Sequence, residues 1–186
     1  GTGLRFPIML DAERWQWADL WRFRRRFGVD NTMWYAHFFG RSMVPFRQKH
    51  PPFWRINRPG KQVFFSAHHM KDENMPSYVR ELNRRRPFWI QGYPSLLTLL
   101  AHYIVDAGDK LQYVPGLVAT SSETLLENQK AIIEKAFGTP CRQWYSQSEA
   151  VASITECPEG RLHVDEDLGY VEFLPNSGGT WRLVAT

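Results

Sequence analysis

From Gln62 onward, the sequence alternates apolar runs of strand length with longer stretches of helical periodicity. Strands are expected at 62–66, 88–91, 113–120 and 141–145, and helices at 72–86, 94–107 and 123–137. Pro94 suits a first helical turn, and Gly108 and Gly138 suit helix ends. Strands that alternate with helices in this way form parallel β-α-β units with right-handed crossovers. The fold class is therefore α/β, with a parallel β-α-β sheet.

The flanking segments have a different pattern. A helix is expected at 11–27, with Asp11 as its N-cap and Gly28 after its end, and a buried strand at 33–39. The proline-rich stretch 45–59 reads as an irregular loop. Short strands at 151–155, 162–164, 170–174 and 181–185 suit antiparallel additions toward the C-terminus. The helix at 11–27 carries Trp15, Trp17 and Trp21, more rings than one face holds, so some of them should meet a second surface.

Composition sets the class of protein. With 186 residues and 43% hydrophobic content, the chain is long and apolar enough to bury a core. No stretch reaches the length of apolar residues that spans a membrane, and the N-terminus lacks a signal pattern. Two cysteines are too few for a secreted disulfide framework. The expected location is the cytoplasm.

Two arginine clusters account for much of the net charge of +4. They lie at 22–26 and 84–86, where both close predicted helices. Cations there favourably meet the negative end of the helix dipole, which is the preferred interpretation. Binding of nucleic acid by basic patches mixed with aromatic rings is the alternative. Because neither cluster comes with a nucleic-acid-binding motif, no nucleic-acid partner is expected.

Two polar segments follow predicted strands. Tyr145-Ser146-Gln147-Ser148-Glu149 follows one, and Ser121-Ser122-Glu123 follows another. Ligands of open α/β sheets bind beyond the carboxyl ends of the strands, so the segments are expected to form one site. An aromatic ring can cover a base, a hydroxyl can contact a phosphate, and a carboxylate can hold a hard cation. This chemistry predicts a Mg-nucleotide site.

These segments, with Ile90-Gln91-Gly92-Tyr93-Pro94-Ser95 between strand and helix and Leu162-His163-Val164-Asp165-Glu166-Asp167 later on, occur in a characteristic order. In this order the chain resembles the adenylate-forming (AMP-binding) enzymes. Within them it is similar to the phenylacetate–coenzyme A ligase-like branch, which includes capsular polysaccharide biosynthesis proteins. The resemblance implies that the chain is part of the large N-terminal domain of such an enzyme. It also implies ATP, Mg²⁺ and coenzyme A as cofactors.

The resemblance assigns roles residue by residue. Tyr145 would lie against the adenine, Ser148 near the α-phosphate, and Glu149 would bind Mg²⁺, which makes Ser148 and Glu149 the catalytic residues. Ser146 stands where the family more often has Gly. The nucleotide-binding residues would be Ser121, Ser122, Glu123, Tyr145 and Ser146. Ser122 is also a good helix N-cap, and the two roles are compatible.

The acid would be bound by residues of two other turns. Ser66-Ala67-His68-His69 resembles a turn that lines the acyl pocket, with His68 where relatives have Tyr. His69 would contact the carboxylate or acyl group, or else be a hydrogen-bonded structural histidine. In Gly92-Tyr93-Pro94-Ser95, a tight turn that starts a helix, Tyr93 would line the same pocket.

Cys157 and His163 form a second candidate metal site. Some relatives carry Cys and His in this region and bind zinc. A single C-x5-H lacks the paired spacing of a structural zinc site, so a buried thiol beside a solvated loop is the preferred interpretation.

The resemblance covers the middle of a family member. Gly1 would be the last glycine of the phosphate loop, and Gly3 stands where relatives have Pro. Residues 1–60 would be a partial first subdomain, and 61–186 the nucleotide- and acyl-binding subdomain. The ribose-binding Asp and the C-terminal lysine domain would lie beyond Thr186. The chain is thus expected to be an internal fragment and to be inactive alone.

The expected function is that of an acid–thiol ligase, which makes an acyl-adenylate with ATP and transfers the acyl group to coenzyme A. The acid is not identified, and a carrier-protein thiol or an amine are alternative acceptors. A non-catalytic nucleotide-binding or scaffold member of the family is a second hypothesis. A basic, aromatic-rich nucleic-acid-binding module is a third, and it predicts binding that weakens steeply with salt.

Overall fold

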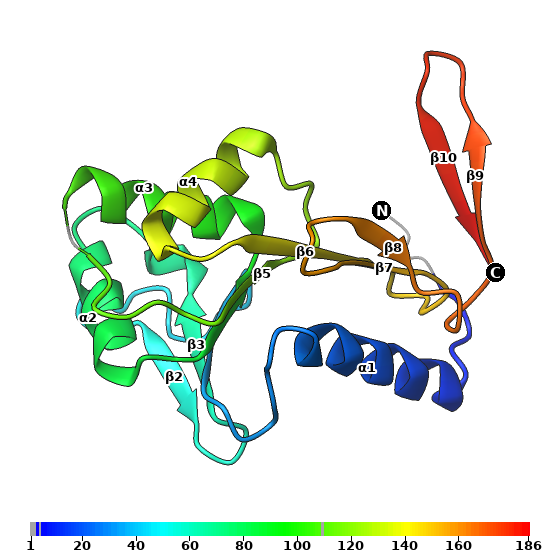
Figure 1. Cartoon of the computed structure of the whole chain (residues 1–186). Helices are drawn as coiled ribbons and strands as arrows, with labels where there is room; N and C mark the ends of the chain where they lie inside the picture. The colour runs from blue at the N-terminus through cyan, green and yellow to red at the C-terminus, as the bar shows by residue number, and fades with distance from the viewer. Residues whose placement is uncertain (1–2, 4, 109) are drawn as a thin grey trace. The chain divides into compact units, whose positions relative to one another are not determined.

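The computed structural model describes residues 3, 5–108 and 110–186. The chain divides into two compact units. Figure 1 labels helices and strands of both. The core unit is Phe27–Gln143, and the terminal unit comprises Gly1–Arg26 and Trp144–Thr186. Gly1, Thr2 and Leu4, to which the phosphate-loop interpretation refers, lie outside the described residues. The expected subdomain boundary near residue 60 stays a prediction.

A mostly parallel sheet forms the centre of the core unit. Its strands are β1 (Tyr35–Phe39), β2 (Trp54–Asn57), β3 (Gln62–Ser66), β4 (Trp89–Gly92), β5 (Leu117–Thr120) and the first residues of β6 (Cys141–Ser146). They lie in the order β2-β3-β1-β4-β5-β6. All neighbours pair in parallel except β2, which lies antiparallel at the edge beside β3. The predicted α/β class is confirmed.

Three helices connect the parallel strands: α2 (Met75–Arg85), α3 (Pro94–Asp106) and α4 (Glu127–Phe137). Each crossover from β3 to β4, β4 to β5 and β5 to β6 moves in the same direction across the sheet. Right-handed crossovers in one direction put their helices on one face of the sheet. The packing of α3 against both α2 and α4 agrees with this arrangement.

Apolar side chains from alternate strand positions fill the space under these helices. Phe38 of β1 and Phe65 of β3 are fully buried, and their rings stack with centroids 4.6 Å apart. Tyr78 of α2 lies over Phe65 at 5.4 Å, and its hydroxyl donates to the carbonyl of Ser66 at 2.7 Å. Burial raises the pKa of this phenol, so Tyr78 stays a neutral donor.

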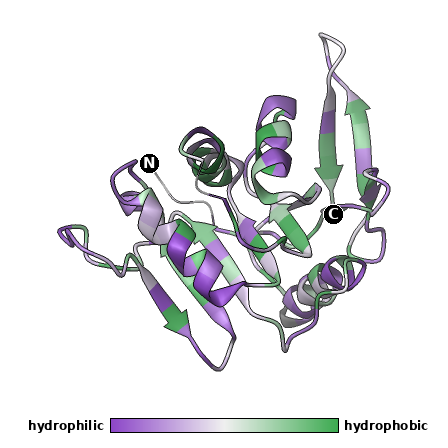
Figure 2. Ribbon diagram, turned by 60° about the vertical axis from the view of Figure 1, so that its left-hand side comes forward, coloured by the Kyte–Doolittle hydropathy of each residue, from purple (hydrophilic) through white to green (hydrophobic). Residues whose placement is uncertain are grey.

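The terminal unit combines one helix with short antiparallel strands. Helix α1 (Leu10–Arg25) buries Leu20 and Phe23. The last residues of β6 pair with β7 (Ser153–Glu156), which pairs in turn with β8 (Leu162–Val164). Strands β9 (Val171–Pro175) and β10 (Trp181–Ala185) form a separate hairpin, along which Figure 2 shows hydrophobic and hydrophilic residues mixed. The expected antiparallel additions are present.

Three local expectations were wrong. The stretch 45–59 contains a strand, β2, which pairs with β3 although prolines flank it on both sides. Helix α1 begins after Met9, so Asp11 lies inside its first turn, where its charge suits the helix dipole. Helix α4 begins after Leu126, so Ser122 is not its N-cap. Residues 121–126, which belong to no helix or strand, separate β5 from this helix.

Trp15 and Trp17 lie largely in solvent on α1, with 59% and 52% of their surfaces exposed, while Trp21 is half-buried. Trp15 and Trp17 are thus among the rings that were expected to meet a second surface. Within the described part of the chain, no helix combines the length and the apolar composition needed to cross a membrane.

Removing one ring of the stack between Phe38 and Phe65 tests the packing of the core. Phe38→Ala should lower the free energy of unfolding by about 3–5 kcal/mol, because it leaves a cavity beneath the helices. Phe46→Ala is the control, since this ring is 66% exposed, and should change stability by about 0.5 kcal/mol. Urea unfolding measures both values, and equal effects would contradict the packing.

Candidate functional site

The carboxyl ends of adjacent parallel strands bring two turns of the core unit together. Strand β4 ends at Gly92 and β5 at Thr120, and these two residues pair in register. Thr120 also pairs with Gln143 of β6. This edge of the sheet is where open α/β folds bind ligands.

The turn after β4 depends on a missing side chain. A Cβ at Gly92 would lie 2.8 Å from both the Cβ and the carbonyl oxygen of Phe38, so only glycine fits. The same Phe38 carbonyl accepts the amide of Tyr93 at 3.0 Å. The half-buried ring of Tyr93 then packs edge-on against Phe39 at 4.7 Å. Pro94 begins α3 directly afterwards. The expected tight turn is therefore present.

The turn after β5 holds a non-glycine residue in the left-handed region. Ser122 has φ of 68°, which costs on the order of 1 kcal/mol for such a residue. Ser121, next to it, is buried, and its amide donates to the Gly92 carbonyl at 3.4 Å. Glu123 accepts two hydrogen bonds from Ser95, from the backbone amide at 2.9 Å and from the hydroxyl at 3.0 Å.

His69 lies at the end of β3, in the short 3₁₀ turn Ala67–His69. Its ring is buried and stacks on Phe53 at 5.0 Å, and its Nδ1 lies 2.8 Å from the Ser66 hydroxyl. Its Nε2 is buried without a hydrogen-bond partner in the described part of the chain. His69 is thus a structural histidine on one side, with a ring nitrogen left for a further partner. His68 is exposed, with its ring beside that of Phe46.

The segment 145–149 belongs to the terminal unit. Tyr145 is 42% exposed at the end of β6, and its hydroxyl accepts a hydrogen bond from Gln147 at 2.9 Å. Ser146, where the family more often has Gly, lies in the strand and does not have a positive φ. The side chains of Ser148 and Glu149 make no hydrogen bond or ion pair with the described residues. A half-buried carboxylate and a hydroxyl are therefore available for a ligand.

Helix α1 holds this segment in place within the terminal unit. The Gln16 side chain donates to the Gln147 carbonyl at 2.9 Å. One helical turn later, the buried Asp19 accepts hydrogen bonds from Ser153 of β7 and from Arg22. The helix thus anchors both sides of the turn that carries Glu149.

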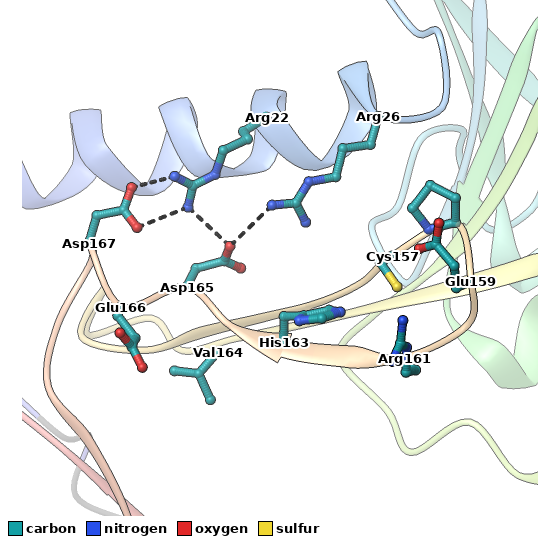
Figure 3. Close-up of a pocket in the computed structure, with 11 residues that line it drawn as sticks. Arg22, Arg26, Cys157, Glu159, Arg161, His163, Val164, Asp165, Glu166 and Asp167 are labelled. Atoms are coloured by element: carbon teal, nitrogen blue, oxygen red, sulfur yellow. Dashed lines mark hydrogen bonds and ion pairs between the residues drawn. The ribbon is translucent and has the colours of Figure 1, made fainter.

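Figure 3 shows how Arg22 and Arg26 extend from α1 to the residues after β8. Arg22 bonds to Asp19 at 2.7 Å and to Asp165 at 3.0 Å, and it also pairs with the more exposed Asp167. Arg26 lies 3.9 Å from Asp165. The hydrogen bond from Arg22 lowers the pKa of Asp167, whereas burial and then the charge of Asp165 raise the pKa of Asp19.

A cavity of about 530 Å³ is lined by Arg22, Arg26, Asp165 and Asp167, together with Cys157 and His163. Cys157 is a buried free thiol and His163 is exposed. Among the described residues, no group of three or more His, Cys, Asp or Glu side chains is placed to hold a metal ion. The candidate zinc pair therefore lacks a third described ligand in this geometry.

The arginine clusters are largely engaged in contacts within the protein. Beyond the ion pairs of Arg22 and Arg26, Arg24 is buried with its guanidinium 5.0 Å from the centre of the Trp21 ring. At the end of α2, Arg84 bonds to Glu81 through two nitrogens at 2.8 Å, and Arg85 pairs with the same carboxylate. These arginines therefore pair with carboxylates or an aromatic ring of their own unit.

The chain is similar to known proteins in its sequence and in its fold. No family model matches the chain. Over 164 residues, or 88% of its length, the chain is 35% identical to Protein CapK of Staphylococcus aureus. The resemblance to a capsular polysaccharide biosynthesis protein is confirmed. The chain spans 36% of the length of that relative.

Two solved structures share the fold. One is a 2-hydroxyisobutyryl-CoA ligase in complex with 2-HIB-AMP and CoA, at 14% identity and a TM-score of 0.56 over 83% of this chain and 34% of the ligase. The other is a malonyl-CoA ligase with methylmalonyl-CoA and AMP bound, at 15% identity and a TM-score of 0.57 over 99% of this chain and 42% of the ligase. The fold is that of the adenylate-forming enzymes.

The structure thus brings some predicted site residues together. Within the core unit, Tyr93, Ser121, Ser122 and Glu123 lie on two hydrogen-bonded turns. Within the terminal unit, Tyr145, Ser146, Ser148 and Glu149 lie on one segment. Ser95 was not predicted as a site residue, although it is the bonding partner of Glu123. Ser95 could have been identified from the sequence, because it is the last residue of the characteristic segment Gly92-Tyr93-Pro94-Ser95.

The buried carboxylate of Asp19 gives the terminal unit a defined pH response. Because its pKa is raised above the ordinary 3.8, the folded state holds this proton more tightly than the unfolded chain does. The contribution of Asp19 to the free energy of unfolding is therefore fully present below pH 3.8 and is lost as pH rises through the raised pKa. Asp19→Asn removes this titration, so wild type should lose stability relative to the variant over that window.

Denaturant unfolding between pH 3.5 and about 7 measures this difference. Asp11→Asn, an exposed carboxylate on the same helix, is the matched control. A constant difference between wild type and Asp19→Asn across the range would contradict the burial-raised pKa.

Proposed function

We propose that this chain is the central part of an AMP-forming carboxylate–coenzyme A ligase. The observation that carries the proposal is the position of the two motifs. Ser121–Glu123 follows β5, and Tyr145–Glu149 begins in the last two residues of β6, the parallel neighbour of β5. The ligases that share this fold are described with acyl-AMP or AMP and with CoA or a CoA ester, which supports the same ligand classes for this protein.

The reaction has two balanced steps. A carboxylate oxygen of the acid attacks the α-phosphorus of ATP, and pyrophosphate leaves as the acyl-adenylate forms. A thiol sulfur then attacks the acyl carbonyl, loses its proton, and expels AMP to give the thioester. The first step needs close alignment of two anions, so positioning and charge neutralisation supply most of the catalysis.

The available groups fit the first step. Glu149 is a half-buried carboxylate without a partner among the described residues, and it would hold Mg²⁺, which would neutralise charge on the phosphates. The Ser148 hydroxyl, equally unpaired, would donate to an α-phosphate oxygen. The exposed ring of Tyr145 would stack on the adenine, and the Ser121–Ser122 turn would border it. Ser146, next to Tyr145, would complete the nucleotide site.

The acid would meet the remaining groups. His69 presents a buried Nε2 that lacks a partner among the described residues, and an unpaired buried nitrogen calls for an acceptor or donor from a ligand. A carboxylate or acyl oxygen of the substrate would supply it. Tyr93 would form a wall of the same pocket. The proposed acceptor is coenzyme A, with a carrier-protein thiol as the alternative.

ATP–pyrophosphate exchange tests the proposal in the protein from the complete reading frame, with a panel of aryl, alkyl and sugar acids. Exchange should require one class of acid, and Glu149→Gln should lower its rate by about 100-fold, because one charged ligand of the Mg²⁺ that neutralises the phosphates is lost. Glu127→Gln is the control. It removes the same charge from an exposed glutamate at the start of α4, and it should leave the exchange rate unchanged.

Equal exchange in wild type and Glu149→Gln would remove Glu149 from the metal site. A protein that binds Mg-ATP but shows no exchange with any acid would be a non-catalytic member of the family. Failure to bind nucleotide at all, with nucleic-acid binding that falls steeply with salt, would overturn the ligase assignment.

A further inference from the structure

The carboxylate of Glu123 is used within the core unit. Its Oε2 accepts the backbone amide of Ser95 at 2.9 Å, and its Oε1 accepts the hydroxyl of the same residue at 3.0 Å. Ser95 is the second residue of α3, directly after Pro94. Glu123 thus reaches from the turn after β5 to the first turn of the helix that follows β4.

A helix N-terminus suits this contact for two reasons. The first amides of a helix have no partner inside the helix, and the positive end of the helix dipole favours a negative charge. Tyr93, the N-cap residue of α3, makes no side-chain capping bond, so Glu123 supplies the cap from another segment. Both oxygens of the carboxylate have a partner in this arrangement.

A third hydrogen bond ties the same two turns. The amide of Ser121 donates to the carbonyl of Gly92 at 3.4 Å. We call these three bonds, which join Gly92 and Ser95 to Ser121 and Glu123, the turn clamp. The turn clamp holds both ends of the segment 121–123 in place. Between those ends lies Ser122, exposed and in the left-handed conformation that a serine rarely adopts.

We infer that Glu123 is a positioning residue, which holds Ser121 and Ser122 in their nucleotide-binding geometry through Ser95 and does not itself contact the nucleotide. This inference rests on the proposed function. It reassigns Glu123 from direct contact with the ligand, and it adds Ser95 as a residue required for the same task.

A double-mutant cycle in the protein from the complete reading frame tests the inference. Glu123→Ala and Ser95→Ala should each raise KM for ATP by about three- to tenfold, the cost of losing hydrogen bonds to a charged group. The value of kcat and KM for the acid should change by less than about twofold, because neither side chain is assigned a contact with the reacting atoms. The double variant should be no worse than Glu123→Ala, because Glu123→Ala already removes both bonds to Ser95.

Two further variants separate positioning from general damage. Ser95→Thr keeps the hydroxyl and the amide and should restore KM for ATP to near the wild-type value. Glu127→Ala removes a nearby exposed glutamate at the start of α4 and should leave KM for ATP unchanged. Additive effects in the double variant, or a Ser95→Ala variant with normal KM, would overturn the inference in favour of direct contact between Glu123 and the nucleotide.

Amide hydrogen exchange provides a readout independent of turnover. Glu123→Ala should speed exchange at the Ser95 and Ser121 amides by about tenfold in the ligand-free protein, since both protections depend on the clamp. Unchanged rates would refute the clamp even in an active enzyme. If wild type shows no pyrophosphate exchange with any acid, the proposed function fails, while the amide rates still decide whether Glu123 holds the turn.

Discussion

Parallel pairing of β1 with both β3 and β4 is the constraint on which the core unit depends. Parallel strands need a long crossover, and three helical crossovers in one direction cover one face of the sheet. The same pairing makes the strands end at a common edge, so the turns after β4 and β5 become neighbours. The aromatic stack of Phe38 on Phe65 forms beneath the helices as a further result.

Sequence periodicity predicted most of this architecture, and the misses have physical causes. Strands 62–66, 162–164 and 181–185 were placed with their observed bounds because turn residues flank regular runs. Strand β2 was missed because the prolines around Trp54–Asn57 indicate a loop, while an edge strand tolerates them. Ser122 was expected to cap α4, but it has a left-handed backbone and the helix begins only after Leu126. The local sequence does not indicate this later start.

The candidate site shows the same division between motif and context. The segments 145–149 and 121–123 were chosen from the sequence because their side-chain types suit a Mg-nucleotide. The partners of those residues were not, because they come from distant positions. Ser95 is 28 residues from Glu123, and Gln16 is 131 residues from Gln147. The buried charges behave alike, since Asp19 meets Ser153 only through tertiary packing.

Gly92 and Glu123 shape the same edge of the sheet by different kinds of force. The carboxylate contacts of Glu123 are attractive and electrostatic, so they weaken when salt screens the charge. The turn at Gly92 is set by exclusion, because the Phe38 carbonyl leaves no room for a side chain. Steric exclusion does not depend on ionic strength or pH. The turn after β4 should therefore keep its shape at salt concentrations that loosen the turn after β5. This edge of the sheet thus combines one rigid turn with one adjustable turn.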